Sequence, residues 1–383
     1  MPSIFLSEEQ ELFRATVRQF AEREIAPRAE DFDQHGVFPH DVFKRLGELG
    51  YFALRYPEEV GGQDADFVTT CLLYEELARA SLSVAVICAM QALMGTYFVF
   101  KYGTDEQKER YLRPALRGEK IGTFAITEPD AGSDLGGIST LARREGDGWV
   151  LKGGKTWITS APVADFIPVG AKTSEERGLE SIALFLVDAN TPGFSVGKPI
   201  EKLGTRSSLT SEIALDDVRL PADALLGKEG EGVKNVGGIL SEIRVMTGAL
   251  SVGVAQAALD AAGKYANERE AFGQPISRHQ AISFKLADMA TQLHAARLMT
   301  YDAAWRMDQG LPVTREASMC KLMASEAAAS ITDEATRIFG SYGFAMELPA
   351  QRYFRDARFL LNGGGTSEIL RMLIGREVSK SYR

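Results

Sequence analysis

Two short segments near the middle of the chain carry residue types that could hold a planar ligand. Phe124-Ala-Ile-Thr-Glu-Pro-Asp-Ala-Gly-Ser-Asp134 begins as a β-branched and aromatic run and then breaks at its proline and glycine. This pattern predicts a strand that ends in a turn, where hydroxyl and backbone N–H groups can approach a ligand closely. The second segment, Gly154-Lys-Thr-Trp-Ile-Thr159, puts an indole and a hydroxyl on one side of a strand. Together the segments indicate a site for a heteroaromatic ring with polar edges.

Other cofactor chemistries lack support in the sequence. No Gly-x-Gly-x-x-Gly follows a predicted strand and opens a helix, which argues against a Rossmann domain. Gly154-Lys155-Thr156 resembles the end of a phosphate-binding loop, but Trp149 stands where that motif requires its first glycine. The four histidines have no metal-ligand spacing, so we expect no metal site. The three cysteines are widely spaced, which favours buried thiols in a reducing cytoplasm.

The composition is that of an ordinary globular protein with an acidic balance. The 383 residues include 45% hydrophobic and 25% charged residues, with a net charge of −9. This charge disfavours nucleic acid or an anionic membrane as the main partner. Acidic residues at the N-terminus and the lack of an apolar core there indicate no signal peptide. The uncharged run from Ser81 to Phe100 predicts a buried helix rather than a membrane span, and we expect a cytoplasmic protein.

The periodicity of apolar residues changes twice along the chain. Ser7 with Gln10, and Thr104 with Gln107, form capping-box patterns that mark helix starts in the first part. The strands predicted in the middle part are residues 122–127, 149–152, 155–159, 182–187 and 213–215. The long helices predicted in the last part are residues 233–267, 276–308, 315–340 and 367–380. We therefore expect three domains, at residues 1–120, 121–228 and 229–383.

These segments together resemble the acyl-CoA dehydrogenase family, whose flavin lies against a Thr-Glu-Pro-x-x-Gly-Ser-Asp turn and a Trp-Ile-Thr strand. The chain has both, at Thr127–Asp134 and Trp157–Thr159, and the resemblance covers nearly its whole length. It implies an N-terminal α-helical domain, a small barrel-like β-domain and a C-terminal four-helix bundle. It also implies FAD as cofactor, a CoA thioester as substrate, electron-transferring flavoprotein as acceptor, and a homo-oligomer, typically a tetramer.

The resemblance assigns roles to particular residues. Arg269-Glu-Ala-Phe-Gly273 and the nearby His279-Gln280 look like the segment by which a neighbouring subunit grips the FAD diphosphate, and Arg269 would supply a bidentate phosphate contact. The positions expected to contact FAD are Phe124, Ile126, Thr127, Gly132, Ser133, Trp157, Thr159, Arg269, Phe272, Ile276, His279, Gln280, Gly340, Thr366 and Glu368. Those expected to contact the substrate are Ser133, Arg244 and Gly364. The family commonly has Asp where this chain has Ser241, so the CoA contact at Arg244 is only partly preserved.

The resemblance fails at the residue that usually takes the substrate's α-proton. Most members carry a Glu directly before a Gly-Thr pair, and the corresponding position here is Gly364. A minority carry the base just before the helix arginine, which here is Ile243. The backbone N–H at Gly364 could still polarise a thioester carbonyl. Glu242 is the nearest carboxylate in sequence and a weaker candidate base, because one helical step of about 100° turns it away; a solvated helix residue is the favoured interpretation.

Three functional hypotheses follow from this substitution. The first is an FAD-dependent acyl-CoA dehydrogenase with an unusual substrate or regiochemistry, such as a cyclic enoyl-CoA that loses a distant proton. In such members a carboxylate on the helix before the β-domain acts as base, and the corresponding place here lies near Gln91, which is an amide. The second hypothesis is oxidation of a thioester on a carrier protein. The third is a flavoprotein of this fold with an oxygenase or binding function.

Overall fold

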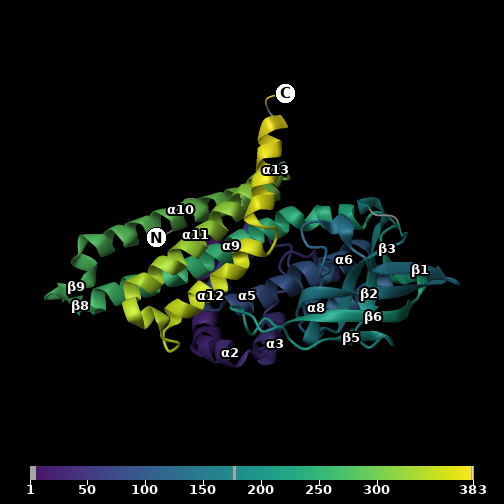
Figure 1. Cartoon of the computed structure of the whole chain (residues 1–383), viewed down its shortest axis with the longest axis horizontal. Helices are drawn as coiled ribbons and strands as arrows, with labels where there is room; N and C mark the ends of the chain where they lie inside the picture. Colours follow the sequence, from purple (N-terminus) through teal and green to yellow (C-terminus); the bar gives the residue numbers. More distant parts are fainter. Residues whose placement is uncertain (1–5, 176–177, 381, 383) are drawn as a thin grey trace.

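The computed structural model describes residues 6–175, 178–380 and 382. Figure 1 shows long helices at one end of an elongated molecule, a β-domain at the other, and the N-terminal helices packed against both. The helix α9 (Gly232–Glu268) runs along most of this length, and α13 (Ser367–Lys380) stands away from the body. The predicted order of helices, β-domain and helices is confirmed.

The N-terminal part is helical, and its starts follow the predicted caps. Ser7 and Thr104 both form capping boxes with the glutamine three residues later. Turns of π-helix interrupt the helices at Ala21–Ile25, Met90–Gly95 and Lys108–Leu112. The helices are α1 (Glu8–Phe20), α2 (Ala29–His35), α3 (His40–Glu48), α4 (Phe67–Ala80), α5 (Leu82–Ala89), α6 (Thr96–Tyr102), α7 (Asp105–Gln107) and α8 (Arg113–Leu116).

Two helical stretches of the described chain are long and apolar enough to cross a membrane, Leu82–Tyr102 and Gly232–Glu268. The first contains most of the uncharged run for which the sequence predicts a buried helix. Of its most apolar window, 83% is buried inside the protein, and for the second stretch the share is 78%. Both are therefore core helices of this fold.

The β-domain is one seven-stranded sheet in the order β5-β6-β2-β1-β3-β4-β7. The Glu145–Gly148 turn closes the β1–β2 hairpin, as predicted. The predicted strand at 122–127 is wrong, because this segment meets β3 only through isolated bridges at Gly122 and Ala125. The strands are β1 (Leu141–Glu145), β2 (Gly148–Thr159), β3 (Phe166–Lys172), β4 (Ile182–Asp188), β5 (Phe194–Val196), β6 (Thr210–Leu220) and β7 (Leu225–Leu226).

The C-terminal helices pack lengthwise on one another. They are α9, α10 (Gln280–Asp308), α11 (Thr314–Phe339), α12 (Pro349–Asn362) and α13. The predicted helix at 276–308 begins later, at Gln280, because residues 276–278 form a separate 3₁₀ turn after the short hairpin of β8 (Glu270–Ala271) and β9 (Gln274–Pro275). This hairpin lies at the end of the molecule opposite the β-domain (Figure 1).

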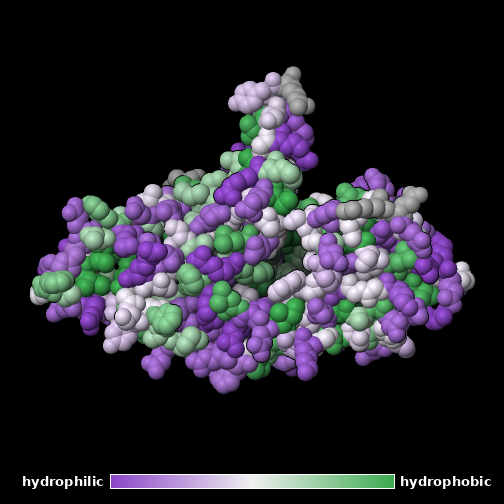
Figure 2. Space-filling model, in the orientation of Figure 1, coloured by the Kyte–Doolittle hydropathy of each residue, from purple (hydrophilic) through white to green (hydrophobic). Residues whose placement is uncertain are grey.

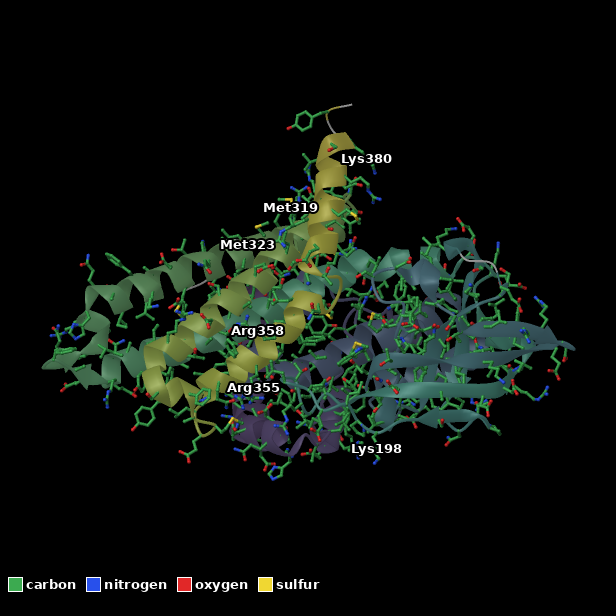
Figure 3. All side chains as sticks on the ribbon, viewed as in Figure 1. Lys198, Met319, Met323, Arg355, Arg358 and Lys380 are labelled. Carbon is green, nitrogen blue, oxygen red and sulfur yellow. The ribbon has the colours of Figure 1, made fainter. Side chains whose placement is uncertain are left out.

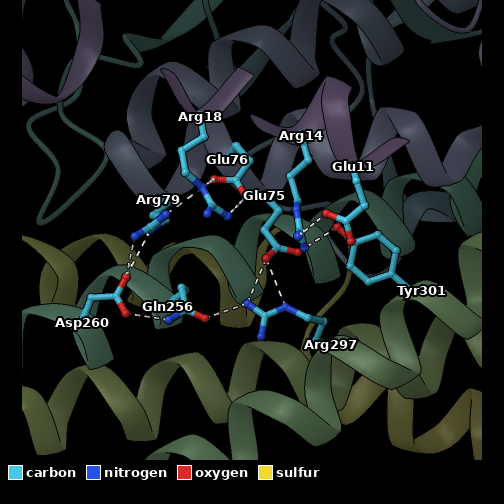
Figure 4. Close-up of polar contacts among 10 residues, drawn as sticks. All are labelled: Glu11, Arg14, Arg18, Glu75, Glu76, Arg79, Gln256, Asp260, Arg297 and Tyr301. Carbon is cyan, nitrogen blue, oxygen red and sulfur yellow. Dashed lines mark hydrogen bonds and ion pairs between the residues drawn. The ribbon is translucent and has the colours of Figure 1, made fainter. Parts of the chain in front are cut away.

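Buried charges fasten the N-terminal helices to the bundle. Glu75 on α4 accepts hydrogen bonds from Arg297, at 2.9 Å, and from the Tyr301 hydroxyl, at 2.7 Å, both on α10. The neighbouring Glu76 pairs with Arg18 of α1 at 2.6 Å. Figure 4 shows these contacts as one network between the layers. Because the two carboxylates are almost fully buried, each needs these partners to offset its desolvation.

Candidate active site

A buried ion pair shapes the turn that follows Thr127. The Lys155 Nζ lies 2.6 Å from the Glu128 carboxylate, and neither side chain is more than 4% exposed. Glu128 also accepts hydrogen bonds from the backbone N–H groups of Ser139 and Thr140. Burial alone would raise the pKa of Glu128, but the charge and hydrogen bonds of these partners lower it to about 2. The pair therefore joins β2 to the turn and fixes the backbone that leads to Ser133.

Trp157 is held on the open side of β2 by a bulge. The register with β6 shifts between Lys155 and Ile158, and Trp157 has a φ of 61°. Its neighbours in the strand are buried, whereas 58% of Trp157 is exposed. A left-handed φ in a bulky residue is strained, so the surrounding strand must impose it. The result is a large aromatic face that packs on no core and is presented to a ligand.

The two predicted segments lie side by side. The Thr156 N–H donates to the Thr127 carbonyl at 3.0 Å, and the Thr123 hydroxyl donates to the Thr159 carbonyl at 2.5 Å. Phe124 is buried and stacks on Phe98 of α6, with ring centroids 4.7 Å apart. Ile126 and Thr127 are half-buried, while Gly132 and Ser133 are exposed. The polar turn thus borders the aromatic face of Trp157, an arrangement that fits a flavin ring.

A deep hollow separates the helical bundle from the β-domain below the base of α13 (Figure 2). Hydrophobic side chains are visible inside it. The loop that ends α12 and begins α13 contains Gly363, Gly364 and Gly365, and we call these residues the glycine loop. Thr366 is half-buried and Glu368 is exposed at the start of α13.

The residues predicted to hold the FAD diphosphate lie at the end of α9 opposite the β-domain within one chain. Arg269 follows the end of α9, whereas Gly232 at its start packs against β4. Because α9 has 37 residues, the two ends are about 55 Å apart. Phe272 is 96% exposed and Gly340 is also exposed. Tyr265, near the end of α9, stacks on Phe339, which directly precedes Gly340, so Phe272 and Gly340 lie at the same end of the molecule. Ile276, His279 and Gln280 follow in the adjoining turn. A single flavin can contact both groups only if the second comes from another copy of the chain.

The surroundings of Gly364 contain no carboxylate among its nearest atoms. Its φ is 74°, and a Cβ there would lie 3.1 Å from the Thr247 hydroxyl and 3.4 Å from the Ile243 side chain. The Thr247 hydroxyl itself donates to the Ile243 carbonyl at 2.7 Å. Within the described residues, the N–H of Gly364 has no hydrogen-bond partner, although those of Gly363 and Gly365 do. A free N–H beside a space with no base is therefore the main feature of this loop.

Glu242 is not the solvated residue that the sequence favoured. It forms an ion pair with Arg55, and both side chains are only 16% exposed. Tyr97 and Phe67 surround the Arg55 guanidinium at 5.6 and 6.0 Å from their ring centroids. The Glu242 carboxylate is already engaged by the arginine, so this pairing argues against Glu242 as proton acceptor. The sequence could not reveal the pair, because Arg55 lies in a loop far away in the chain.

Gln91 and Arg244 differ from their predicted surroundings. Gln91 is 1% exposed, donates to the carbonyls of Ala115 and Lys120 and accepts from the Gly122 N–H, so its amide is a structural link and not a pocket residue. Arg244 is 6% exposed and turns into the bundle, where it reaches Ser318 of α11 at 3.4 Å. Burial lowers its pKa. The contact of Arg244 with a CoA thioester stays a prediction.

Comparisons with known proteins match all three parts of the chain to the same family. Family models described as the N-terminal, middle and C-terminal domains of acyl-CoA dehydrogenase match residues 7–119, 123–218 and 230–379. The chain is 49% identical to benzylmalonyl-CoA dehydrogenase of Aromatoleum aromaticum, over 98% of this chain and 99% of that one. It is 43% identical to the mitochondrial short-chain specific acyl-CoA dehydrogenase of Bos taurus, over 100% and 92%. Its fold superposes on butyryl-CoA dehydrogenase from Megasphaera elsdenii with a TM-score of 0.95 at 36% identity, covering 99% and 100% of the two chains.

Proposed function

The chain belongs to the acyl-CoA dehydrogenase family, and we propose that it oxidises a CoA thioester that carries a carboxylate on its α-carbon and loses it as CO₂. The observation behind this proposal is Gly364 at the position where a base is expected. The atoms nearest to a side chain at this position belong to Thr247 and Ile243, a hydroxyl and an aliphatic group. Neither can take a proton from a carbon acid at neutral pH.

A substrate with an α-carboxylate needs no such base. When CO₂ departs, the electron pair of the broken C–C bond stays on the α-carbon, where the thioester carbonyl delocalises it. Proton abstraction is replaced by loss of CO₂. The name of the 49% identical relative describes a malonyl thioester, in which the α-carbon carries a carboxylate. This supports a malonyl-type substrate for this chain as well.

The missing side chain also removes a repulsive charge. A carboxylate at position 364 would lie close to the substrate's own carboxylate. Two like charges 4 Å apart repel by about 4 kcal/mol at an effective dielectric of about 20. Glycine leaves both the space and a neutral surface. Glu242, which precedes Ile243 in sequence, is already paired with Arg55.

The chain's own groups then bind and polarise the thioester. The free N–H of Gly364 would donate to the carbonyl oxygen and stabilise the charge that develops on it. Trp157, Thr127 and Ser133 would hold the flavin of FAD, with Arg269 from a second copy at the diphosphate. FAD, when bound, supplies a hydride acceptor for the β-hydrogen. The balance converts R-CH₂-CH(COO⁻)-CO-S-CoA into R-CH=CH-CO-S-CoA and CO₂, with one hydride passing to the acceptor. The negative charge of the carboxylate leaves with the hydride, so no proton is taken up or released.

The test compares two thioesters that differ only in the carboxylate. Anaerobic single-turnover reduction of the flavin is measured with benzylmalonyl-CoA and with 3-phenylpropionyl-CoA, and CO₂ is counted with a ¹³C label. We expect fast reduction and one CO₂ per flavin with the first, and reduction about 10²–10⁴-fold slower with the second, the usual cost of a missing base. Faster reduction by 3-phenylpropionyl-CoA, or reduction by benzylmalonyl-CoA without CO₂, would refute the proposal.

The other hypotheses predict different results in the same assay. A cyclic enoyl-CoA that reduces the flavin faster than benzylmalonyl-CoA would favour the alicyclic branch. Activity only on a carrier-bound thioester would favour the carrier-protein alternative. Rapid oxidation of the reduced flavin by O₂ would favour an oxygenase. We expect electron-transferring flavoprotein to be the acceptor and the cytoplasm to be the location.

A homo-oligomer, most simply a tetramer, accounts for the exposed apolar surfaces at the ends of the bundle. Phe272 and Phe344 are 96% and 93% exposed. Met319 and Met323 lie on α11 close to where α13 leaves the body, as Figure 3 shows, and Met372 on α13 is 61% exposed. Burying such side chains against another copy is favourable. It would also bring the Arg269 hairpin to a neighbour's flavin.

A further inference from the structure

Lys321 is a fully buried cation below the glycine loop. It lies on α11, and its side chain is 0% exposed. Its ammonium group donates to the carbonyl of Leu361 at 3.1 Å and to that of Gly365 at 2.7 Å. These carbonyls stand on either side of the peptide that carries the free N–H of Gly364. One side chain thus holds both ends of the segment.

A loop of three glycines needs such an anchor. Gly364 and Gly365 have φ values of 74° and 109°, and glycine has more backbone freedom than any other residue. Within the loop, the Gly363 N–H donates to the Phe359 carbonyl at 3.0 Å and the Gly365 N–H to the Asn362 carbonyl at 3.3 Å. These are local bonds, which close turns but do not fix the loop relative to the bundle. Lys321 supplies the link to another helix.

A buried lysine that served only as a structural link would cost folding free energy, because its charged ammonium group must lose its hydration. Burial lowers the pKa of Lys321 to about 8. Both of its hydrogen bonds go to main-chain carbonyls and neither to a carboxylate, and Arg244 adds a second buried positive charge on the facing helix. Arg358 of α12 also links its helix to α11, by donating to the Ala329 carbonyl. Because Arg358 is only half-buried, that link needs no fully buried charge. The charge at Lys321 therefore suggests an electrostatic purpose.

We propose that Lys321 is a positioning residue for catalysis, which orients the glycine loop so that the Gly364 N–H faces the thioester carbonyl. By donating hydrogen bonds to the carbonyls of Leu361 and Gly365, it keeps the glycine peptides from rotating. Its charge, together with that of Arg244, also favours the negative charge that develops on the thioester when CO₂ or a proton leaves. This role rests on the proposed binding of a thioester carbonyl at Gly364, but it does not depend on whether the substrate carries a carboxylate.

The experiment measures the bound carbonyl directly. A 3-thiaacyl-CoA labelled with ¹³C at the carbonyl is the probe, because its β-position is sulfur and has no hydrogen to transfer. The infrared difference spectrum of the FAD-loaded protein gives the carbonyl stretch of the bound thioester. Lys321→Met keeps the length and apolar stem of the side chain but removes its charge and donors. Lys152→Met, at an exposed position of β2, is the matched control for loss of one lysine.

We expect the parent and Lys152→Met to shift the carbonyl stretch equally to lower frequency, and Lys321→Met to lose most of this shift. The kcat on benzylmalonyl-CoA should fall about tenfold or more in Lys321→Met, towards the 10²–10³-fold cost of a lost oxyanion donor, with a smaller change in KM. Lys321→Gln, which keeps two N–H donors on a shorter stem, should recover part of both signals and replaces Lys321→Met if that variant does not fold.

A purely structural lysine gives a different pattern. The melting temperature would fall while the carbonyl shift and kcat stayed at the parent values, and this result would overturn the proposal. Failure of the proposed function is recognised separately. If the parent itself does not shift the carbonyl stretch, the Gly364 N–H does not bind the thioester. If the shift is normal but no CO₂ is released, only the substrate assignment is wrong.

Discussion

Gly364→Glu is expected to shift the substrate preference from thioesters with an α-carboxylate towards thioesters without one. It places a carboxylate where the family resemblance locates the proton acceptor, beside the free N–H of the same residue. On 3-phenylpropionyl-CoA, which has no α-carboxylate, a positioned general base is worth about 10²–10⁴-fold, or about 3–5 kcal/mol of barrier. On benzylmalonyl-CoA the same carboxylate repels the substrate.

The structure determines how much conformational strain a glutamate at position 364 would introduce. A residue other than glycine at a φ of 74° costs about 1–2 kcal/mol. Its Cβ would lie 3.1 Å from the Thr247 hydroxyl, so that hydroxyl must move by a few tenths of an ångström. If the full strain appears as loss of the active loop conformation, about 1–4 kcal/mol remains, a gain of roughly fivefold to thousandfold. On benzylmalonyl-CoA, the repulsion of two charges about 4 Å apart adds a loss of up to about 4 kcal/mol to the same strain.

Two control variants separate these terms. Gly364→Ala has the strain and the Cβ contact without a carboxylate, and Gly364→Gln has nearly the shape of Glu without its charge. Single-turnover flavin reduction by both thioesters should show the gain only in Gly364→Glu. The reasoning fails if the parent is already fast on 3-phenylpropionyl-CoA and Gly364→Glu leaves that rate unchanged, because another residue would then supply the base.

Two further predictions concern the cofactor and the buried ion pair. Trp157→Ala and Arg269→Ala should each weaken FAD retention, measured as flavin released on dilution, and unchanged retention in both would refute the predicted cofactor placement. Glu128→Gln should lower the free energy of unfolding by about 3–5 kcal/mol at pH 7, because it leaves Lys155 buried without its partner. Since the pKa of Glu128 falls from about 4.5 in the unfolded chain to about 2 in the folded one, the parent's advantage should be complete above pH 4.5 and shrink as the pH falls towards 2. Urea unfolding at several pH values measures this difference, and a constant difference down to pH 2 would contradict it.

The sequence predicts elements whose signals are local. The capping boxes at Ser7 and Thr104 and the long helices of the last part are read from neighbouring residues, and both are confirmed. The strand β3 (Phe166–Lys172) was missed, since every residue in it is buried and it contains Pro168 and Gly170, which obscure an alternating pattern. The strand predicted at 122–127 has a favourable composition, but its hydrogen bonds go to single residues of β3. Pairing is decided by tertiary contacts that composition does not contain.

In the candidate site, too, local features could be predicted and long-range pairings could not. The exposed face of Trp157 and the exposed turn at Ser133 could be predicted because each lies within one short motif. The pairing of Glu128 with Lys155 and of Glu242 with Arg55 could not, since a charged residue gives no sign of its partner.

The position of Lys321 within its helix is a signal that the sequence contains. It stands in an apolar stripe of α11 at helical spacing with Ala317, Ala324 and Ala328, all of which are buried. A lysine on the buried face of a helix must be neutralised by something specific, so such a position indicates a partner even when the partner is unknown.

The way the glycine loop is anchored explains how its chemistry can change while the fold does not. Lys321 binds main-chain carbonyls at Leu361 and Gly365 and no side chain of the loop. The free N–H of Gly364 belongs to the main chain as well. The side chain at position 364 therefore takes no part in holding the loop, and the main-chain N–H is present whichever residue stands there. We propose that a carboxylate at this position suits a substrate that must lose a proton. Its absence suits a substrate that brings its own leaving carboxylate, so one position, at the cost of the strain of a side chain at a φ of 74°, separates the two reactions.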